Sequence, residues 1–395
     1  MSPRILMWEH HDWESPIRVG GRAFAQHFLE AGWRVAWLNG PLAVWNVVGG
    51  SDETRRRRAS WISGGARRGE ASRLFTYAPL ALFPYRRYPI LRNPWFHRHS
   101  LTLTLPSLER ALDRQGFATV DLLWLATGSP MLPLLDRIPH AQSLYRLSDE
   151  TASFPDTPRS YRRLEEEALS RVDCVIATAA SLAERASRFC RKVLLLPNGV
   201  DCSRFGAPQA PPSALRRVAS LRRIVYVGAL DSWLDAGKIV ALARAYPEVE
   251  IHLAGPLRMD AAWARPLRNI TLAGPVSPED VPRLLAESDV GIIPFADTPL
   301  TRAIHPVKLY EYLAAGLPVV ASDLDEIRRI GSPALLARTE TEWIEAVRQA
   351  VAVRRPEEAR AFAARNDWSS RFDALLGFLG EARSSAQGLD RRSPA

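Results

Sequence analysis

The sequence predicts an α/β protein with two doubly wound parallel-sheet domains. Short apolar runs alternate with amphipathic helical stretches from one end of the chain to the other, which is the pattern of parallel strands joined by helices. The alternation is interrupted once near the middle and then restarts. The chain has 395 residues, more than one hydrophobic core usually supports, so its length also favours two domains.

The first domain is predicted over residues 1–205. Residues 20–31 are expected to form the first crossover helix, which Gly32 closes as its C-terminal cap. The strands of this domain are predicted at residues 5–9, 34–39, 121–126, 143–147, 174–178 and 193–196.

The second domain is predicted over residues 214–360. Before it, Asn198-Gly-Val-Asp201 turns the chain, and residues 205–213 have the Gly and Pro content of a linker. One helix is expected to open at Ser277-Pro-Glu-Asp280, with Ser as the cap and Pro at the first helical position. The strands are predicted at residues 224–228, 249–254, 270–273, 290–294, 318–322 and 334–337.

A last helical stretch is predicted from residue 357 to 382, because its apolar residues lie on one face. The polar residues 384–395 are expected to form a disordered tail.

Composition limits the partners. Hydrophobic residues make up 47% and charged residues 24%, as in a globular protein, and the net charge of +9 favours anionic partners. The three cysteines and the scattered histidines match no zinc or disulfide pattern, so neither a metal nor a cofactor is expected. No apolar run is long enough to span a bilayer, and the N-terminus turns charged too early for a secretory signal, which favours the cytoplasm.

Residues 51–100 fit the α/β pattern poorly, because clustered arginines alternate there with aromatic residues. Such a mixture suits an anionic membrane surface, which would place the protein peripherally on the inner face of the cytoplasmic membrane. The alternative is a surface excursion whose aromatic residues pack on the first domain. A nucleic-acid partner is not expected, because no nucleic-acid-reading module is recognisable.

The segment from His305 to Ser322 is the most informative. It predicts a helix with Pro306 at its first position and Gly316 just beyond its end, followed by a buried strand. Such a helix directs unpaired N–H groups and a partial positive charge at whatever precedes it, so it suits a diphosphate. His305 lies directly before this start.

Lys308 and Glu311 lie on one face of the predicted helix. The ammonium of Lys308 suits a phosphate oxygen, and the carboxylate of Glu311, about 4.5 Å further along the axis, suits ribose hydroxyls. The alternative is an ordinary surface ion pair between the two. Gly228, Phe295 and Arg302 are the other candidates for donor contact, with packing as an equal explanation for Phe295.

The pattern Lys308-x-x-Glu311-Tyr-x-Ala-x-Gly-x-Pro-Val-Val resembles the donor-site helix of the GT-B glycosyltransferases, including those of group 1. Asn198-Gly-Val-Asp-x-x-x-Phe205 is similar to the end of their first domain. The resemblance implies two Rossmann-like domains facing a cleft, a C-terminal helix (366–383) that returns to the first domain, and a nucleotide-sugar donor, most commonly UDP-linked. Retaining members of the group carry a second glutamate eight positions before Glu311, where this chain has Ala303.

The N-terminal half resembles a different family. His11-Asp-Trp-x-Ser-Pro-x-Arg18 and Tyr145-Arg-Leu-Ser-Asp149 are similar to segments of the inverting glucuronosyltransferase of xanthan-type polysaccharide assembly. That resemblance implies Asp149 as the general base and a lipid-linked or polysaccharide acceptor.

Asp149 follows a predicted strand, and ligands of open α/β sheets bind beyond the carboxyl ends of strands. The alternative for Asp149 is a helix N-cap. Asp12 is the second candidate for the base, with an ion pair to Arg18 as its alternative. The acceptor is expected to contact His11, Arg18, Gly20 and Gly21, since bare glycine backbone allows close approach.

The predicted function is the metal-independent, inverting transfer of a sugar from a nucleotide diphosphate to a lipid-linked or polysaccharide acceptor. Three alternatives stay open: a retaining group 1 transferase, a non-hydrolysing UDP-sugar 2-epimerase, and a binding protein without catalytic activity.

Overall fold

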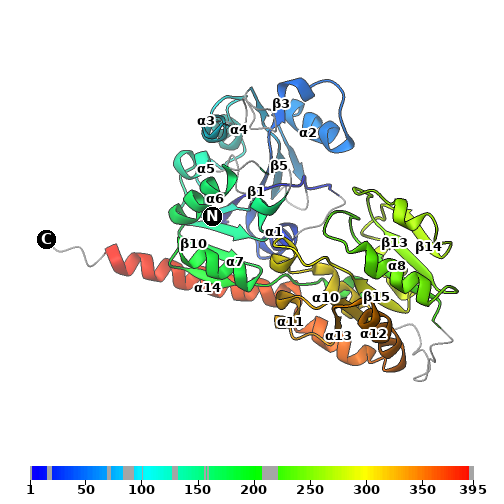
Figure 1. The fold of residues 1–395 in the computed structure, drawn as a ribbon. Helices are drawn as coiled ribbons and strands as arrows, with labels where there is room; N and C mark the ends of the chain where they lie inside the picture. The colour runs from blue at the N-terminus through cyan, green and yellow to red at the C-terminus, as the bar shows by residue number, and fades with distance from the viewer. Residues whose placement is uncertain are drawn as a thin grey trace. The chain divides into compact units, whose positions relative to one another are not determined.

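The computed structural model describes residues 2–15, 20–68, 73–82, 93–99, 101–126, 132–154, 157, 160–206 and 221–390. The chain divides into two compact units. Unit 1 comprises Met1–Pro197 and Phe372–Ala395, and unit 2 comprises Asn198–Arg371 (Figure 1). Each unit is an α/β structure with its own parallel sheet.

Unit 1 contains an eight-stranded sheet in the order β11-β10-β9-β8-β1-β2-β5-β4. All neighbouring strands are parallel except β4, which pairs antiparallel with β5. In that order the strands span Val193–Leu195, Cys174–Ala177, Ser143–Leu147, Leu122–Leu125, Arg4–Glu9, Arg34–Asn39, Leu74–Tyr77 and Ala66–Arg68.

A second, three-stranded sheet of unit 1 was not predicted. It consists of β3 (Leu42–Ala43), β6 (Leu80–Ala81) and β7 (Thr104–Leu105), in that order. It lies in the region that fitted the α/β pattern poorly, and its two-residue strands are too short to leave a periodic signal. The helices of unit 1 are α1 (Gly20–Glu30), α2 (Asp52–Ile62), α3 (Pro94–His99), α4 (Leu108–Arg114), α5 (Leu132–Arg137), α6 (Tyr161–Arg171), α7 (Ala180–Ser187) and most of α14 (Trp368–Asp390).

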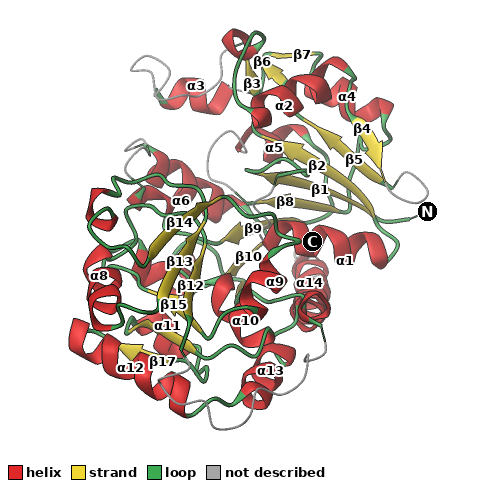
Figure 2. Cartoon of the chain, turned by 90° about the vertical axis from the view of Figure 1, so that its right-hand side faces the viewer, coloured by secondary structure: helices red, strands yellow, loops and turns green. Residues whose placement is uncertain are grey.

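Unit 2 contains a six-stranded parallel sheet in the order β14-β13-β12-β15-β16-β17 (Figure 2). In that order the strands span Ile270–Gly274, Glu250–Ala254, Arg223–Val227, Val290–Ile293, Val319–Ser322 and Leu335–Ala337. Its helices are α8 (Ala236–Ala245), α9 (Val281–Ala286), α10 (Val307–Ala314), α11 (Asp325–Arg329), α12 (Glu340–Ala352) and α13 (Pro356–Ala364).

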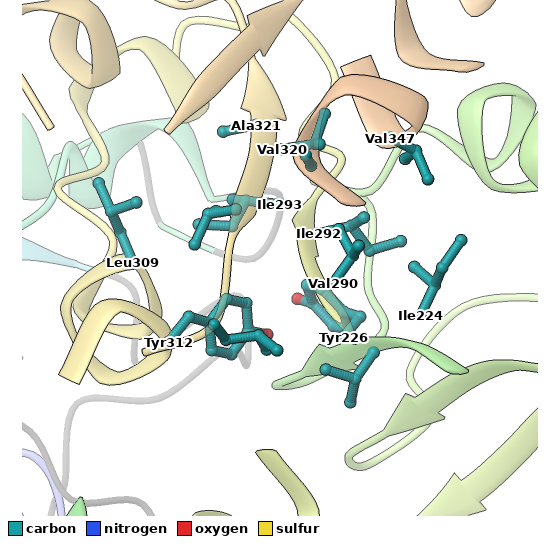
Figure 3. Packing of buried hydrophobic residues seen from close by; sticks show 14 of the residues in the cluster. Ile224, Tyr226, Val290, Ile292, Ile293, Leu309, Tyr312, Val320, Ala321 and Val347 are labelled. Atoms are coloured by element: carbon teal, nitrogen blue, oxygen red, sulfur yellow. The ribbon is translucent and has the colours of Figure 1, made fainter. Parts of the chain in front are cut away.

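The core of unit 2 fixes the position of α10. The central strands are buried on both faces, and so they read as continuous apolar runs (Figure 3). Tyr312 of α10 packs directly over Gly291 of β15, where a Cβ atom would lie 2.4 Å from the tyrosine ring. The hydroxyl of Tyr312 also accepts a hydrogen bond from the Val227 backbone N–H, at 2.7 Å. The helix is therefore tied to the ends of two neighbouring strands.

Three predicted boundaries differ from the structure. Ser277 and Asp280 form a turn rather than a helix start, and α9 begins at Val281, because the Ser277 hydroxyl bonds to Asp280 within that turn. The predicted last helix is two helices, since Arg365–Asp367 separate α13 from α14. Helix α14 continues to Asp390, through the start of the predicted tail; residues 391–395 lie outside the described residues.

Within the described ranges, no helix combines the length and the apolar character that crossing a bilayer requires.

Candidate functional site

Helix α10 has the capping pattern that the sequence predicted, displaced by one residue. Pro306 is the N-cap residue, and Gly316, with a φ of 74°, follows the end of the helix at Ala314. The residues that face the core are buried, whereas Lys308 and Glu311 are half-buried. Both functional candidates therefore lie on the face of α10 that is directed away from the core.

Lys308 is brought together with two other predicted donor residues. Its Nζ lies so close to Gly228 that a Cβ atom there would be 2.5 Å away. The same ammonium is 5.4 Å from the centre of the Phe295 ring. It also donates a hydrogen bond of 2.8 Å to the hydroxyl of Tyr226. The structure thus places one cation beside the carboxyl ends of β12 and β15, where α/β proteins bind ligands.

Glu311 faces an arginine that the sequence analysis missed. An oxygen of the Glu311 carboxylate lies 3.6 Å from Nη1 of Arg204. Burial raises the pKa of Glu311, and the charges of Arg204 and Lys308 oppose that rise. The two cations favour the carboxylate form, which accepts hydrogen bonds from ribose hydroxyls. Arg204 stands one residue before the end of the Asn198–Phe205 motif, and that position was the available signal.

His305 holds the loop before α10 rather than presenting its ring to solvent. Its Nε2 pairs with the Tyr310 hydroxyl at 2.5 Å, and its Nδ1 pairs with Glu326 at 3.1 Å. Burial lowers the pKa of His305, an effect that the contact with Glu326 opposes. Its backbone carbonyl accepts a hydrogen bond of 2.8 Å from the Asn198 side chain. Both ring nitrogens are thus occupied by internal contacts.

Two other donor candidates differ in their freedom. Phe295 is 3% exposed, so its ring is mostly covered by its own unit. Arg302 is exposed and forms a two-pronged pair with Asp297, in which Nε donates at 2.6 Å and Nη2 at 3.1 Å. In this structure the guanidinium of Arg302 is engaged outside the Lys308 group.

In unit 1, Asp149 follows strand β9 and is half-buried. The alternative interpretation as a helix N-cap is wrong, because the next helical turn is Thr151–Ser153 and its N-cap is Glu150. The Ser148 hydroxyl donates a hydrogen bond of 2.9 Å to Asp149 Oδ2. The buried guanidinium of Arg146 feels the charges of both Asp149 and Glu9, which oppose the lowering of its pKa by burial.

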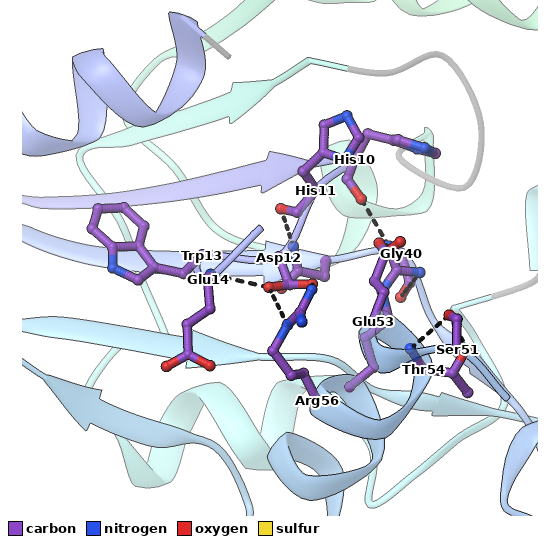
Figure 4. A network of polar contacts seen from close by, with 12 residues as sticks. His10, His11, Asp12, Trp13, Glu14, Gly40, Ser51, Glu53, Thr54 and Arg56 are labelled. Carbon is purple, nitrogen blue, oxygen red and sulfur yellow. Dashed lines mark hydrogen bonds and ion pairs between the residues drawn. The ribbon is translucent and has the colours of Figure 1, made fainter. Parts of the chain in front are cut away.

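Asp12 forms an ion pair with Arg56. Nε and Nη2 of Arg56 each lie 3.0 Å from one oxygen of the Asp12 carboxylate (Figure 4). The same carboxylate accepts a third hydrogen bond from the Glu14 backbone N–H, at 3.0 Å. The expected alternative partner, Arg18, lies outside the described residues. With both oxygens engaged, Asp12 is less suited than Asp149 to accept a substrate proton.

The backbone of His11 is fixed as well, since its carbonyl accepts hydrogen bonds from the side chains of Trp37 and Asn39. Its ring packs edge-on against His10. The structure shows no acceptor and leaves the predicted contact of His11 untested.

The space beside Gly21 is filled by a buried acid. A Cβ atom at Gly21 would lie 2.0 Å from Oε1 of Glu9, and both Gly20 and Gly21 are buried. Close approach at Gly21 therefore serves the Glu9 carboxyl in this structure, rather than leaving bare backbone open to a ligand. The indole N–H of Trp124 donates to the same Glu9 oxygen at 2.9 Å. Burial raises the pKa of Glu9 to about 7, against the charge of Arg146 and the hydrogen bond from Trp124.

The arginine cluster of α2 is largely used inside unit 1. Arg57 donates to the carbonyls of His10 and Gly40, at 2.8 and 3.3 Å. Arg58 donates to the carbonyls of Val47 and Gly49, at 2.9 and 3.1 Å. Together with Arg56, these side chains hold the loops that follow β1 and β2. Sequence clustering alone could not distinguish this internal role from a charged surface.

Among the described residues, no group of three or more His, Cys, Asp or Glu side chains could hold a metal ion.

The two parallel-sheet units and the placement of Lys308 and Glu311 on α10 define a GT-B glycosyltransferase. Residues 219–352 match the family described as "Glycosyl transferases group 1". The chain therefore carries a group 1 glycosyltransferase domain in unit 2, and it is an enzyme of the glycosyltransferase class. The epimerase and the non-catalytic alternatives are accordingly set aside.

Relatives agree with this assignment. The chain is 26% identical over 327 residues to TuaH of Bacillus subtilis (strain 168), named as a teichuronic acid biosynthesis glycosyltransferase; the match covers 76% of this chain and 80% of that protein. It is 28% identical over 302 residues to the D-inositol 3-phosphate glycosyltransferase of Stackebrandtia nassauensis, covering 65% and 66%.

Among solved structures, sucrose-phosphate synthase from Thermosynechococcus elongatus has a TM-score of 0.69 at 16% identity, covering 97% of this chain and all of that one. Anabaena HepE, in complex with UDP and glucose, has a TM-score of 0.66 at 15% identity, covering 96% and 100%. These similarities confirm the predicted fold class.

Proposed function

We propose that this glycosyltransferase moves a sugar from a UDP-linked donor to a lipid-linked or polysaccharide acceptor, with inversion at the anomeric carbon and without a metal. The observation that carries the proposal is the position of Lys308: its ammonium stands in the first turn of α10, beside Gly228 at the carboxyl end of β12. A diphosphate there would meet a cation and the positive end of a helix together.

The donor would be held in two parts. Lys308 and the backbone N–H groups at the start of α10 would bind the diphosphate, and Glu311, one turn further, would accept hydrogen bonds from the ribose. HepE has been crystallised with UDP and with UDP-glucose, which supports UDP as the nucleotide for this fold. The name of TuaH refers to a polysaccharide pathway, which supports a glycan acceptor.

Asp149 would act as the general base. It would take the proton of the acceptor hydroxyl as that oxygen bonds to the anomeric carbon and the bond to UDP breaks. The charge that develops on the leaving diphosphate would be stabilised by Lys308 and by the α10 dipole. Assignment of the base rests on the resemblance to the xanthan-type enzyme and on the half-buried carboxylate beyond β9.

The retaining mechanism is the second candidate, because it is the one associated with the paired glutamates of group 1 members. In this chain the position of the first glutamate is Ala303, which is 5% exposed and carries no polar group. That observation favours inversion. Proton NMR of the product, read from the anomeric coupling constant, would decide between the two mechanisms.

The direct test of the donor site is calorimetric titration of the full chain with UDP and with AMP. We expect saturable binding of UDP and much weaker binding of AMP, which lacks the second phosphate that Lys308 would contact. Absence of UDP binding would contradict the proposed donor site.

An anionic membrane is the proposed surface partner, which would place the enzyme on the cytoplasmic face of the inner membrane. Large apolar side chains are exposed around the small sheet of unit 1: Val44, Trp45, Val48, Ile62, Trp95, Leu103 and Leu105. We call these seven residues the apolar rim. Because Arg56, Arg57 and Arg58 make internal contacts, insertion of the apolar rim would contribute more than the charge of α2.

A further inference from the structure

We propose that unit 1 carries a subsite for one uncharged sugar ring of an oligosaccharide acceptor, in the cavity beside His10, Asn46 and α2. The inference rests on the proposed transferase function and specifies the acceptor class. The cavity has a volume of about 210 Å³. Pockets for drug-sized ligands span roughly 300–1,000 Å³, so this one is too small for a whole sugar nucleotide and suits a single ring.

The position of the cavity follows from the parallel sheet. His10 continues β1 and Pro41 follows β2, while Glu53, Thr54 and Arg57 reach it from the first turns of α2 (Figure 4). Adjacent strands of a parallel sheet end at the same edge, so the cavity opens at the edge where α/β proteins bind their ligands. None of its lining residues was among the predicted acceptor contacts.

The lining has the mixed chemistry that a sugar requires. Pro41 and Leu42 supply aliphatic surface for the C–H face of a ring. The amide of Asn46 has two N–H donors and one acceptor oxygen, and Thr54 adds a hydroxyl. Among the described residues, the Asn46 side chain has no hydrogen-bond partner. Its full capacity is therefore open to the hydroxyls of a ligand.

The charges of the lining select an uncharged ring. Arg57 is the cation of the wall, but Nη2 donates to the His10 carbonyl and to Glu53, and Nη1 donates to the Gly40 carbonyl. Its side chain is 15% exposed, whereas that of Glu53 is 39% exposed. The accessible charge is thus a carboxylate that Arg57 already compensates. An anionic ring would meet this carboxylate without a free cation to balance it.

The distance from Asp149 implies an acceptor longer than one sugar. His10 continues β1, Asp149 follows β9, and β8 lies between these two strands in the sheet. With strands about 4.8 Å apart, the two strand ends are about 10 Å apart across the sheet. A ring in the cavity is therefore not the one that presents its hydroxyl to Asp149. It would be another ring of the same oligosaccharide.

The test is saturation-transfer NMR on the full chain with two matched probes, methyl β-D-glucopyranoside and its C6 carboxylate analogue, at pH 7. We expect transfer to the neutral probe and at least threefold weaker transfer to the anionic one. Asn46→Trp fills the cavity and should reduce transfer to the neutral probe at least fivefold. Ile62→Trp adds an indole to an exposed site at the end of the same helix and should leave transfer unchanged.

Calorimetric titration with UDP separates this proposal from the proposed function. Asn46→Trp should bind UDP as the wild type does, which also shows that unit 2 is folded, and circular dichroism should show the same melting temperature. Binding of the neutral probe without binding of UDP would leave the sugar subsite standing and remove the transferase proposal. Equal transfer to Asn46→Trp and wild type, stronger transfer to the anionic probe, or no transfer to the wild type would each overturn the subsite.

Discussion

The guanidinium of Arg56 holds the Asp12 carboxylate through two parallel hydrogen bonds, each 3.0 Å long. Asp12 is 9% exposed, and Arg56 reaches it from helix α2, forty-four positions along the chain. This ion pair joins the loop after β1 to α2. It also leaves Asp149 as the acid of unit 1 with the freer carboxylate.

Replacement of Arg56 by Ala should destabilise unit 1 by about 1–3 kcal/mol, because it leaves a buried carboxylate without its charged donor. The free energy of unfolding can be measured from urea denaturation. Arg55→Ala is the matched control, since Arg55 is 65% exposed and pairs only with Asp52 within the same helix. The control should change stability by less than about 0.5 kcal/mol. Equal effects of the two substitutions would show that the Asp12 pair is not structural.

Lys308→Ala and Glu311→Ala should each weaken UDP binding by about 1–3 kcal/mol, the cost of leaving a charged partner unpaired. Calorimetry gives the affinities directly. Arg348→Ala removes an exposed cation of unit 2 that pairs with Glu345, and it should leave the affinity unchanged. If Glu311→Ala binds UDP like the wild type, Glu311 is not a ribose ligand and its contact with Arg204 is purely structural.

Asp149→Asn should abolish sugar transfer nearly completely while UDP binding is retained, because the amide cannot accept the acceptor proton. Product formation is measured with UDP-sugar and a membrane extract or a glycan acceptor. Asp136→Asn serves as the control, as Asp136 is an exposed residue of α5 that pairs with Arg171. Transfer by Asp149→Asn at the wild-type rate would remove Asp149 as the base.

Glu9 predicts a pH dependence of stability. Its pKa is about 7 in the folded protein against an ordinary value of 4.5, so between these values the folded state holds a proton that the unfolded state has lost. Stability at this site is therefore greatest at low pH and falls as the pH rises toward 7. Glu9→Gln removes the titration, and its stability relative to the wild type should rise by about 2–3 kcal/mol from pH 5 to pH 8.

The comparison requires urea denaturation of both proteins at both pH values. Glu109→Gln, a change at a half-buried residue of α4 that pairs with Arg137, provides the control for a carboxyl without such burial. A constant difference between wild type and Glu9→Gln would mean that Glu9 does not take up a proton near neutral pH.

The apolar rim predicts membrane binding. The chain should sediment with anionic liposomes, and the combined replacement Val48→Ser and Ile62→Ser should release it, because these two side chains are 87% and 71% exposed. Salt should weaken binding only in part, since the apolar contribution is not screened. The same sedimentation with neutral liposomes would contradict a role for anionic lipid, and unchanged binding of the double variant would exclude the rim.

The sequence by itself determined the two α/β units and twelve of their strands, because buried parallel strands read as apolar runs whatever their neighbours are. It also placed Lys308 and Glu311 on one helix face, since that follows from helical spacing alone. Only the tertiary structure decided which charges meet. The pairs Asp12–Arg56 and Glu311–Arg204, and the contact of Glu9 with Gly21, join residues far apart in the chain, and no local periodicity records such contacts. For the same reason the arginines of α2 looked like a surface charge in the sequence and proved to be internal supports in the fold.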